Sequence, residues 1–296
     1  MNIVVTGGAG FIGHQLVAAL CQRGHTITVL DNLHRGSFER PELAAAQVTE
    51  GDIRDAAICA AAFEGAACVI HLAAQSNVMG SQDDPDYTFE TNVAGTWTVA
   101  AAAARAGVAH LIFASSREVY GEPASLPVAE DAPLRPFNLY GASKAAGEAL
   151  LGTLPWPALH VSVLRLANVI GHGDHGRVVP LWLAAATAGE PLVVYGGGQI
   201  LDFVPIETVV EAFVRVAETG PLKEPVNVGS GVPVPLTELA ERIIGITQSG
   251  SKVDTRPARG PEITRFCADT SRMQSILGMS PPTDAVGTIE RWWGRS

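Results

Sequence analysis

The N-terminal segment places a short strand, a glycine-rich turn and a helix in immediate succession. Residues 2–6 form a β-branched run, and residues 7–13 read Gly-Gly-Ala-Gly-Phe-Ile-Gly. Gly7 permits a tight turn, Gly10 lets the backbone approach a phosphate, and Gly13 allows the following helix to pack closely. The free NH groups and the positive dipole end of that helix favour a bound pyrophosphate. This opening predicts a parallel α/β sheet that binds a dinucleotide.

The second strand-like run, residues 26–30, ends directly at Asp31. A carboxylate at this distance from a glycine-rich turn is placed to accept hydrogen bonds from an adenosine ribose. Its charge repels a 2′-phosphate and therefore favours NAD over NADP, although Arg35, four residues later, slightly weakens that preference. Asp52 follows a third strand-like run and is a candidate for contact with the adenine.

Strand-like runs alternate with helical stretches through the first half of the chain, at 2–6, 26–30, 46–50, 67–73, 108–115 and 159–165. This rhythm is typical of a doubly wound parallel sheet, the Rossmann α/β fold. After about residue 166 it gives way to loops rich in glycine and proline. We therefore expect an NAD-binding Rossmann domain over 1–165 and a smaller, mainly substrate-binding lobe over 166–296, with some segments of the lobe returning to the sheet.

Composition excludes several classes of partner. The chain has 296 residues, of which 47% are hydrophobic and 17% charged, and its formal net charge is −10 with no basic run. From this composition we expect a compact globular protein that binds neither nucleic acid nor a membrane. No apolar run approaches the roughly 18 residues that span a bilayer, and because the first strand begins at residue 2 we expect no signal peptide. The four cysteines show no metal-type spacing, so we expect buried thiols in a reducing cytoplasm.

Two histidine-containing segments invite other interpretations. His71 lies in a buried-looking strand, 68–74, and is interpreted as a satisfied core histidine because no acid or nucleophile flanks it. A glycine-rich loop carries a second group, His172, Asp174 and His175. No third histidine or cysteine lies at ligand spacing, so we expect a substrate-side loop and no metal.

The run Tyr140-Gly-Ala-Ser-Lys144 carries the main chemical signal. Its i,i+4 spacing puts the phenol and the ammonium on one face of a helix. A tyrosine ordinarily ionises near pH ~10, and a neighbouring cation lowers that pKa, so Tyr140 can act as a base near neutrality with Lys144 beside it.

With these segments in place, the chain resembles the extended short-chain dehydrogenase/reductases of the NAD-dependent sugar-nucleotide epimerase/dehydratase family, of the UDP-glucose 4-epimerase type. The matching motifs extend through nearly the whole chain, at 6–13, 31–33, 51–55, 71–75, 91–96, 115–121, 140–144, 165–168 and 227–231. So many motifs in the same order are specific for the family. They say much less about which reaction is catalysed and which sugar is the substrate.

The resemblance implies a role for each matching residue. Ser116 hydrogen-bonds the sugar hydroxyl that is oxidised, Tyr140 is the acid/base, and Lys144 binds the nicotinamide ribose and keeps the phenol acidic. The phenolate takes the O4 proton as hydride leaves C4 for NAD, which gives a 4-keto sugar. The implied contacts to NAD come from Gly7, Gly10, Phe11, Ile12, Asp31, Asn32, Asp52, Ile53, Leu72, Ala73, Ala74, Gln75, Asn92, Tyr140 and Lys144.

Two positions bear on which reaction follows. The 4,6-dehydratases of the family carry an Asp-Glu pair after the active-site Thr, whereas this chain has Arg117 and Glu118. The missing acid disfavours dehydration, because the leaving hydroxyl would lack a proton donor. Glu118 keeps a decarboxylase open, since UDP-glucuronate decarboxylases have a Glu there, and it equally fits a carboxylate that only pairs with Arg117. Arg117 is itself a candidate for binding a uronate carboxylate.

The diphosphate-binding pattern departs from the family at one position. Leu201 replaces a phosphate-binding arginine, Arg259 matches the second such arginine, and Arg177 is a candidate substitute for the lost charge. The expected contacts to the sugar nucleotide are Ser116, Arg117, Glu118, Asn168, Arg177, Val179, Tyr195, Arg259 and Glu262.

The sequence therefore predicts an NAD-dependent nucleotide-sugar 4-epimerase for a UDP-hexose or UDP-uronate, which assembles as a homodimer in the manner common to the family. The alternative within the same fold is a nucleotide-sugar decarboxylase or 4,6-dehydratase that uses Glu118. A non-catalytic NAD-sensing protein is disfavoured, because such proteins typically lose the Tyr or the Lys and both are present here.

Overall fold

The structure, a computed structural model, describes residues 1–293 and divides them into two compact units. The first unit contains residues 1–121, 133–166 and 209–226. The second contains residues 122–132 and 167–208 and the described residues from 227 onward. The chain thus crosses between the units several times, and 209–226 is a segment that returns to the first unit.

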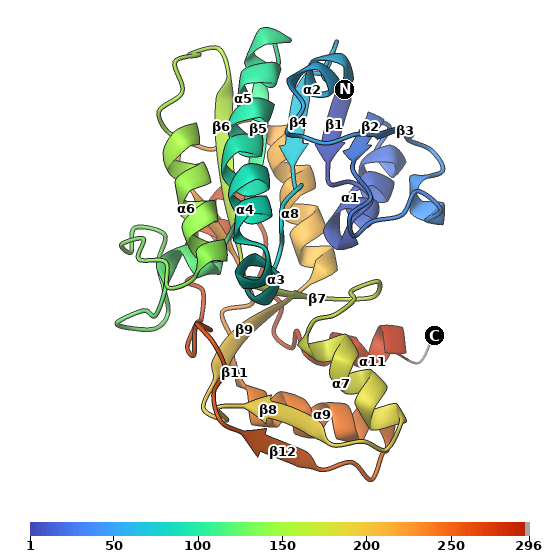
Figure 1. Cartoon of the computed structure of the whole chain (residues 1–296), viewed down its shortest axis with the longest axis vertical. Helices are drawn as coiled ribbons and strands as arrows, with labels where there is room; N and C mark the ends of the chain where they lie inside the picture. Colours follow the sequence, from blue (N-terminus) through green and yellow to red (C-terminus); the bar gives the residue numbers. More distant parts are fainter. Residues whose placement is uncertain (294–296) are drawn as a thin grey trace. The chain divides into compact units, whose positions relative to one another are not determined.

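A seven-stranded sheet is the central element of the fold, in the order β10-β6-β5-β4-β1-β2-β3 (Figure 1). Every pair from β3 to β6 across this order is parallel. The strands are β1 Asn2–Thr6, β2 Thr26–Asp31, β3 Gln47–Glu50, β4 Cys68–His71, β5 His110–Ser116, β6 His160–Leu166 and β10 Val226–Val228. The chain order reverses between β1 and β4, which is where open α/β sheets bind ligands. The doubly wound α/β fold predicted from the sequence is confirmed.

Helices cover both faces of this sheet. They are α1 Phe11–Gln22, α2 Ala56–Ala62, α3 Val78–Asp83, α4 Pro85–Phe89, α5 Thr96–Arg105, α6 Leu139–Leu151 and α8 Ile206–Thr219, with a π-helical segment Glu90–Gly95 and 3-10 turns Pro41–Leu43 and Arg117–Tyr120. α5 packs between α2 and α6, and Figure 1 shows α5 and α6 in front of the sheet with α8 behind it. Arg23, at the end of α1, pairs with Glu211 and Glu218 of α8.

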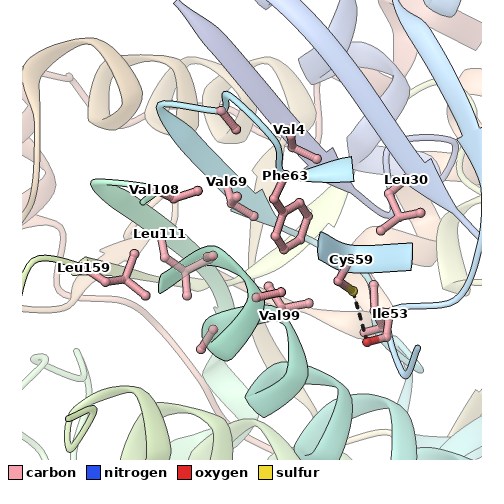
Figure 2. Packing of buried hydrophobic residues seen from close by; sticks show 14 of the residues in the cluster. Val4, Leu30, Ile53, Cys59, Phe63, Val69, Val99, Val108, Leu111 and Leu159 are labelled. Atoms are coloured by element: carbon pink, nitrogen blue, oxygen red, sulfur yellow. Dashed lines mark hydrogen bonds between the residues drawn. The ribbon is translucent and has the colours of Figure 1, made fainter. Parts of the chain in front are cut away.

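The apolar core under α2 and α5 is drawn in Figure 2. Val69 of β4 and Leu111 of β5 meet Phe63, at the end of α2, and Val99 of α5, and all four side chains are fully buried. Removing each from water contributes about 1.5–3 kcal/mol. This packing holds α5 against the strands whose carboxyl ends carry the site residues described below.

The second unit contains smaller sheets. β7 Asn168–Ile170, β9 Ile200–Pro205 and β11 Pro233–Pro235 form one, and β8 Leu192–Tyr195 pairs with β12 Val253–Arg256 in the other. Its helices are α7 Val178–Thr187, α9 Leu236–Thr247, α10 Ser271–Leu277 and α11 Thr288–Trp293. Asp202 of β9 is fully buried and accepts hydrogen bonds from Ser230 N and Oγ, Gly231 N and Ala268 N at 2.6–3.0 Å. This carboxylate ties three separate segments of the unit together.

Two expectations drawn from composition can be compared with the structure. Within residues 1–293, no helix combines the length and apolar character that crossing a membrane requires. All four cysteines are thiols. The expectation of buried thiols is confirmed for Cys59, Cys68 and Cys267 and is wrong for Cys21, which is partly exposed.

Candidate active site

The glycine-rich turn between β1 and α1 leaves little room for side chains. Gly7 has φ +71°, and a Cβ added there would lie 2.6 Å from Ala73 N at the end of β4. A Cβ on Gly13 would collide with the carbonyl oxygen of Gly7. Gly10 is the N-cap of the 12-residue helix α1. The turn therefore exposes backbone NH groups at a helix N-terminus, and these donors fit the pyrophosphate of a dinucleotide.

Asp31 ends β2 beside this turn and is held by the backbone. Its Oδ2 accepts from Ala9 N at 3.0 Å and its Oδ1 from Leu33 N at 2.8 Å. Burial raises the pKa of the Asp31 carboxyl, and the two backbone hydrogen bonds partly oppose that rise. Each oxygen keeps acceptor capacity for a ribose hydroxyl.

The expected adenine contact, Asp52, belongs to a polar cluster. Its carboxylate accepts hydrogen bonds from Nε and NH2 of Arg54, at 3.0 and 2.9 Å, and from Nδ2 of Asn32, at 3.0 Å. Burial alone would raise the pKa of Asp52, but the hydrogen bonds and charge of Arg54 lower it overall. Arg54 also lies 5.1 Å from the centroid of the Tyr87 ring. Sequence reasoning did not single out Tyr87, because its link to Asp52 comes through the fold.

The end of β4 is joined to the helix that carries Tyr140. Asn92 exchanges hydrogen bonds with the backbone of Gln75, at 2.8 and 3.0 Å, and donates to Ser143 Oγ of α6 at 2.9 Å. It is almost fully buried. These contacts make Asn92 a fixed link between the end of β4, where Leu72, Ala73 and Ala74 lie, and α6.

His71 is a core histidine, as interpreted from the sequence. Its Nδ1 lies 2.8 Å from Thr6 Oγ1 and its Nε2 lies 3.1 Å from Thr96 Oγ1. Burial, and secondarily the charge of Lys144, lowers the pKa of His71 to about 3, so the ring is neutral. It connects β1, β4 and α5.

Ser116 and the Tyr140–Lys144 pair lie on adjacent elements. Ser116 is the last residue of β5, and α6 packs against β5 and against the 3-10 turn that follows it. Lys144 Nζ donates to Ala114 O of β5 at 2.9 Å and lies 4.8 Å from the Phe113 ring centroid. Burial lowers the pKa of Lys144 to about 8, and the charge of Glu148 partly opposes that shift. Tyr140, one turn earlier, is partly exposed.

An ion pair lies behind Lys144. Arg165 Nε donates hydrogen bonds to the two carboxylate oxygens of Glu148 at 3.0 and 3.2 Å, and Arg165 NH2 donates to Oε2 at 2.6 Å. Both side chains are buried. Ser115 Oγ donates to Glu148 at 2.5 Å, and Arg165 NH1 donates to Tyr120 Oη at 2.9 Å. Glu148 was not predicted as a site residue, although its i,i+4 spacing from Lys144 was visible in the sequence.

Glu118 is engaged on both carboxylate oxygens. Its Oε1 lies 2.8 Å from Arg117 NH2, and its Oε2 accepts from Asn138 Nδ2 at 2.7 Å. Both members of the ion pair are buried. The structure thus brings Glu118 to Arg117, the pairing that the sequence left open, and adds Asn138, which the sequence did not single out.

The other expected substrate contacts belong to the second unit. The Arg259 guanidinium lies 4.1 Å from the centroid of the Tyr195 ring, and Arg259 Nε lies 3.6 Å from Glu262 Oε2. These three residues therefore form one group.

Elsewhere in that unit, Arg177 immediately precedes α7 and lies 3.7 Å from Asp174. Val179 and Leu201 are buried, and Asn168 Nδ2 donates to Asp202 O at 2.9 Å. Throughout residues 1–293, no three His, Cys, Asp or Glu side chains are grouped in a way that could hold a metal ion.

Comparison with known proteins gives concordant results. The profile of the NAD dependent epimerase/dehydratase family matches residues 3–229. A UDP-glucose 4-epimerase of Mycolicibacterium smegmatis is 36% identical over 294 residues, covering 95% of this chain and 94% of the relative. The Thermotoga maritima UDP-glucose 4-epimerase, solved with UDP-glucose, superposes with a TM-score of 0.92 at 29% identity, covering 100% of this chain and 99% of that one.

A dTDP-glucose 4,6-dehydratase of Streptomyces venezuelae, solved with NAD, also gives a TM-score of 0.92, at 28% identity, covering 100% of this chain and 98% of that one. The overall backbone therefore does not separate the two reactions. The extent of the profile match and the identity to the mycobacterial relative nevertheless establish the family. This chain belongs to the NAD dependent epimerase/dehydratase family.

Proposed function

We propose that this protein is an NAD-dependent 4-epimerase of a nucleoside-diphosphate hexose, with a UDP-hexose as the substrate. The observation that carries the proposal is the pairing of a complete Ser116, Tyr140 and Lys144 set with a Glu118 carboxylate that is bound on both oxygens. The mycobacterial and Thermotoga proteins, both UDP-glucose 4-epimerases by name, support the choice of nucleotide and sugar.

The first unit has the donors and acceptors that NAD requires. The backbone NH groups at the start of α1 would hold the pyrophosphate, and Asp31 would accept the adenosine ribose hydroxyls and repel a 2′-phosphate. NAD, when bound, supplies the hydride acceptor that oxidises C4 of the sugar and the hydride donor that reduces the resulting ketone.

The protein's own chemistry is a proton transfer. Tyr140 Oη, as the phenolate, accepts the proton of the C4 hydroxyl, and the Lys144 ammonium stabilises that phenolate. Ser116 Oγ accepts a hydrogen bond from Glu118 N at 3.2 Å, which leaves its own O–H to donate to the sugar oxygen. After the 4-keto sugar has rotated, Tyr140 returns the proton to O4, and hydride returned by the bound cofactor to the opposite face of C4 would give the inverted configuration.

Glu118 separates this reaction from those that lose water or carbon dioxide. Elimination requires a carboxyl group free to exchange protons with C5 or C6 of the sugar. The carboxylate of Glu118 is instead bound by the guanidinium of Arg117 and the amide of Asn138. Because Arg117 already pairs with Glu118, its charge is neutralised within the protein. This favours a neutral hexose over a uronate as the substrate.

The second unit supplies the groups for the nucleotide. Arg259 and Arg177 are both partly exposed cations, and either can bind a diphosphate oxygen. Tyr195 offers an aromatic face beside Arg259. We assign the NAD-binding role to the first unit and nucleotide-sugar recognition mainly to the second.

A homodimer built on α4 and α5 fits the exposed aromatic residues of the first unit. Phe89 is 59% exposed and Trp97 is 42% exposed. Trp97 packs against Trp156 with ring centroids 5.3 Å apart. Large exposed aromatic side chains on neighbouring helices are typical of a protein interface.

A cytoplasmic location fits the state of the thiols. All four cysteines are free thiols, and a reducing compartment keeps thiols in this state. A fluorescent fusion viewed in intact cells tests the assignment, and signal confined to an extracytoplasmic compartment would contradict it.

The proposed reaction is tested by incubating the purified, NAD-loaded protein with UDP-, GDP- and dTDP-sugars and resolving the products by mass and by NMR. We expect a product of unchanged mass with inverted C4 from a UDP-hexose. Loss of water would identify a dehydratase, and loss of carbon dioxide from a UDP-uronate would identify a decarboxylase.

A further inference from the structure

The 3-10 turn after β5 contains a buried charge pair next to the start of α6. Arg117 and Glu118 are both buried in the first unit, and Arg117 NH2 lies 2.8 Å from Glu118 Oε1. The other oxygen, Oε2, accepts from Asn138 Nδ2 at 2.7 Å. We call these three residues, Arg117, Glu118 and Asn138, the Glu118 clamp.

Asn138 uses both ends of its amide. While Nδ2 donates to Glu118, Oδ1 accepts from Gly141 N at 2.8 Å and so caps α6. Rotating the amide by half a turn would place its oxygen against the carboxylate and its NH2 against an NH donor. The negative charge of Glu118 therefore fixes the orientation of the cap.

The first turn of α6 also rests directly on the backbone of Glu118. A Cβ added to Gly141 would collide with Glu118 O and approach Glu118 C to 2.9 Å. Tyr140 immediately precedes this glycine. On the other side, Glu118 N donates to Ser116 Oγ at 3.2 Å. Glu118 thus contacts Ser116 through its backbone NH, and the turn that carries Tyr140 through its side chain and its carbonyl.

We propose that Glu118 is a positioning residue, which fixes Tyr140 relative to Ser116 through Asn138 while Arg117 neutralises its charge. The assignment rests on the proposed epimerase function, because it gives Glu118 no part in moving protons on the sugar. A Glu at this position is also a feature of the family's dehydratases and decarboxylases, and here it would support Tyr140 indirectly, through Asn138.

Substitutions in the clamp separate positioning from proton transfer. Glu118→Gln keeps the shape but turns an NH2 group toward either Arg117 or Asn138, both of which donate. Asn138→Ser keeps a capping oxygen and removes the donor to Glu118. Glu64→Gln, at an exposed glutamate of the same unit, is the matched control.

We expect Glu118→Gln and Asn138→Ser each to lower kcat by about 10- to 100-fold with KM nearly unchanged, because misplacing a reacting group weakens only the chemical step. The double variant should lose little more than either single variant, since both break the same link. Glu64→Gln should match the wild type.

A second readout needs no turnover. The phenol of Tyr140 is titrated by its ultraviolet absorbance, with Tyr140→Phe as the blank, in both the NAD-free and the NAD-loaded protein. Both clamp variants should raise the phenol pKa, because Tyr140 moves away from the cations that favour its phenolate. Thermal melting establishes that each variant is folded.

Unchanged kcat and unchanged phenol titration in both folded variants would overturn the proposal. Glu118→Gln protein that accumulates NADH while Asn138→Ser stays active would also overturn it, and would make Glu118 a proton-transfer group. If the wild type epimerises no sugar in the panel, the proposed function fails, and the titration still decides whether the clamp positions Tyr140.

Discussion

Lys144 shows how the surroundings of single residues set the chemistry of α6. Its ammonium is buried against Phe113 and the carbonyl of Ala114, and this burial lowers its pKa to about 8. Glu148, one turn further along the helix, partly opposes the shift. Arg165 holds Glu148 in place. The cation that stabilises a Tyr140 phenolate is therefore itself maintained by the Glu148–Arg165 ion pair.

Tyr140→Phe tests the proton acceptor. The substitution keeps the ring and removes the phenol, so turnover should fall by about 10²- to 10⁴-fold, the usual cost of losing a general base. NAD binding, measured by calorimetry, should be retained because the glycine-rich turn before α1 is unchanged. Near-normal turnover in this variant would exclude Tyr140 as the acid/base.

Glu148→Gln tests the support of Lys144. Removing this carboxylate takes away the charge that raises the Lys144 pKa, so the lysine should lose its proton at a lower pH. The alkaline limb of the kcat profile should therefore move toward neutrality. A limb at the wild-type position would show that Lys144 does not control it. The variant should also unfold more easily, by about 3–5 kcal/mol, because Arg165 loses its buried partner.

At the level of strands and helices, the sequence predicted most of what the structure contains. The β-branched runs and glycine turns located β1 and β2 to within a residue, because the strand period and turn chemistry are local properties. The link from Asn138 to Glu118 was beyond prediction. It depends on how the end of β5 meets the start of α6, and no local pattern reports a contact across that distance.

His71 of β4, which contacts Thr6 of β1 and Thr96 of α5, provides a test of how these three elements are held together. Its folded pKa, about 3, lies below the ordinary 6.5, so only the unfolded chain binds the proton as the pH falls between these values. Stability contributed by the neutral ring is present above pH 6.5 and is lost as pH falls toward 3. Between pH 6.5 and pH ~4 this amounts to about 3 kcal/mol.

In His71→Gln that increment should disappear from the pH dependence of the unfolding free energy, measured in urea. Identical acid slopes in the variant and the wild type would show that His71 does not limit acid stability.

At the level of the whole chain, the order of segments in the two units was only partly visible in sequence. The strand rhythm marked the first unit through β6, and Gly- and Pro-rich loops marked the change after it. The return of 209–226 to the first unit left no compositional sign, because α8 is amphipathic like any surface helix. The substrate residues were named from motif resemblance, and their grouping, as with Tyr195 and Arg259, required coordinates.

The proposed homodimer can be tested by substituting an exposed aromatic residue of α5. Trp97→Asp should convert the proposed homodimer to a monomer in light scattering, because a charge on α5 cannot be buried in an apolar interface. Ile276→Asp is the control, since Ile276 is 48% exposed on α10 of the other unit and should leave assembly unchanged. A wild type that is monomeric at micromolar concentration would contradict the dimer.

The fate of the hydrogen on C4 distinguishes the proposed reaction most directly from its alternatives. The NAD-loaded protein is incubated with UDP-galactose that carries deuterium at C4, and the product is read by NMR and mass spectrometry. We expect UDP-glucose with the deuterium still on C4, because the same hydride returns to the carbon that it left. Deuterium found at C6 of a product lighter by one water, or lost to solvent, would contradict a 4-epimerase.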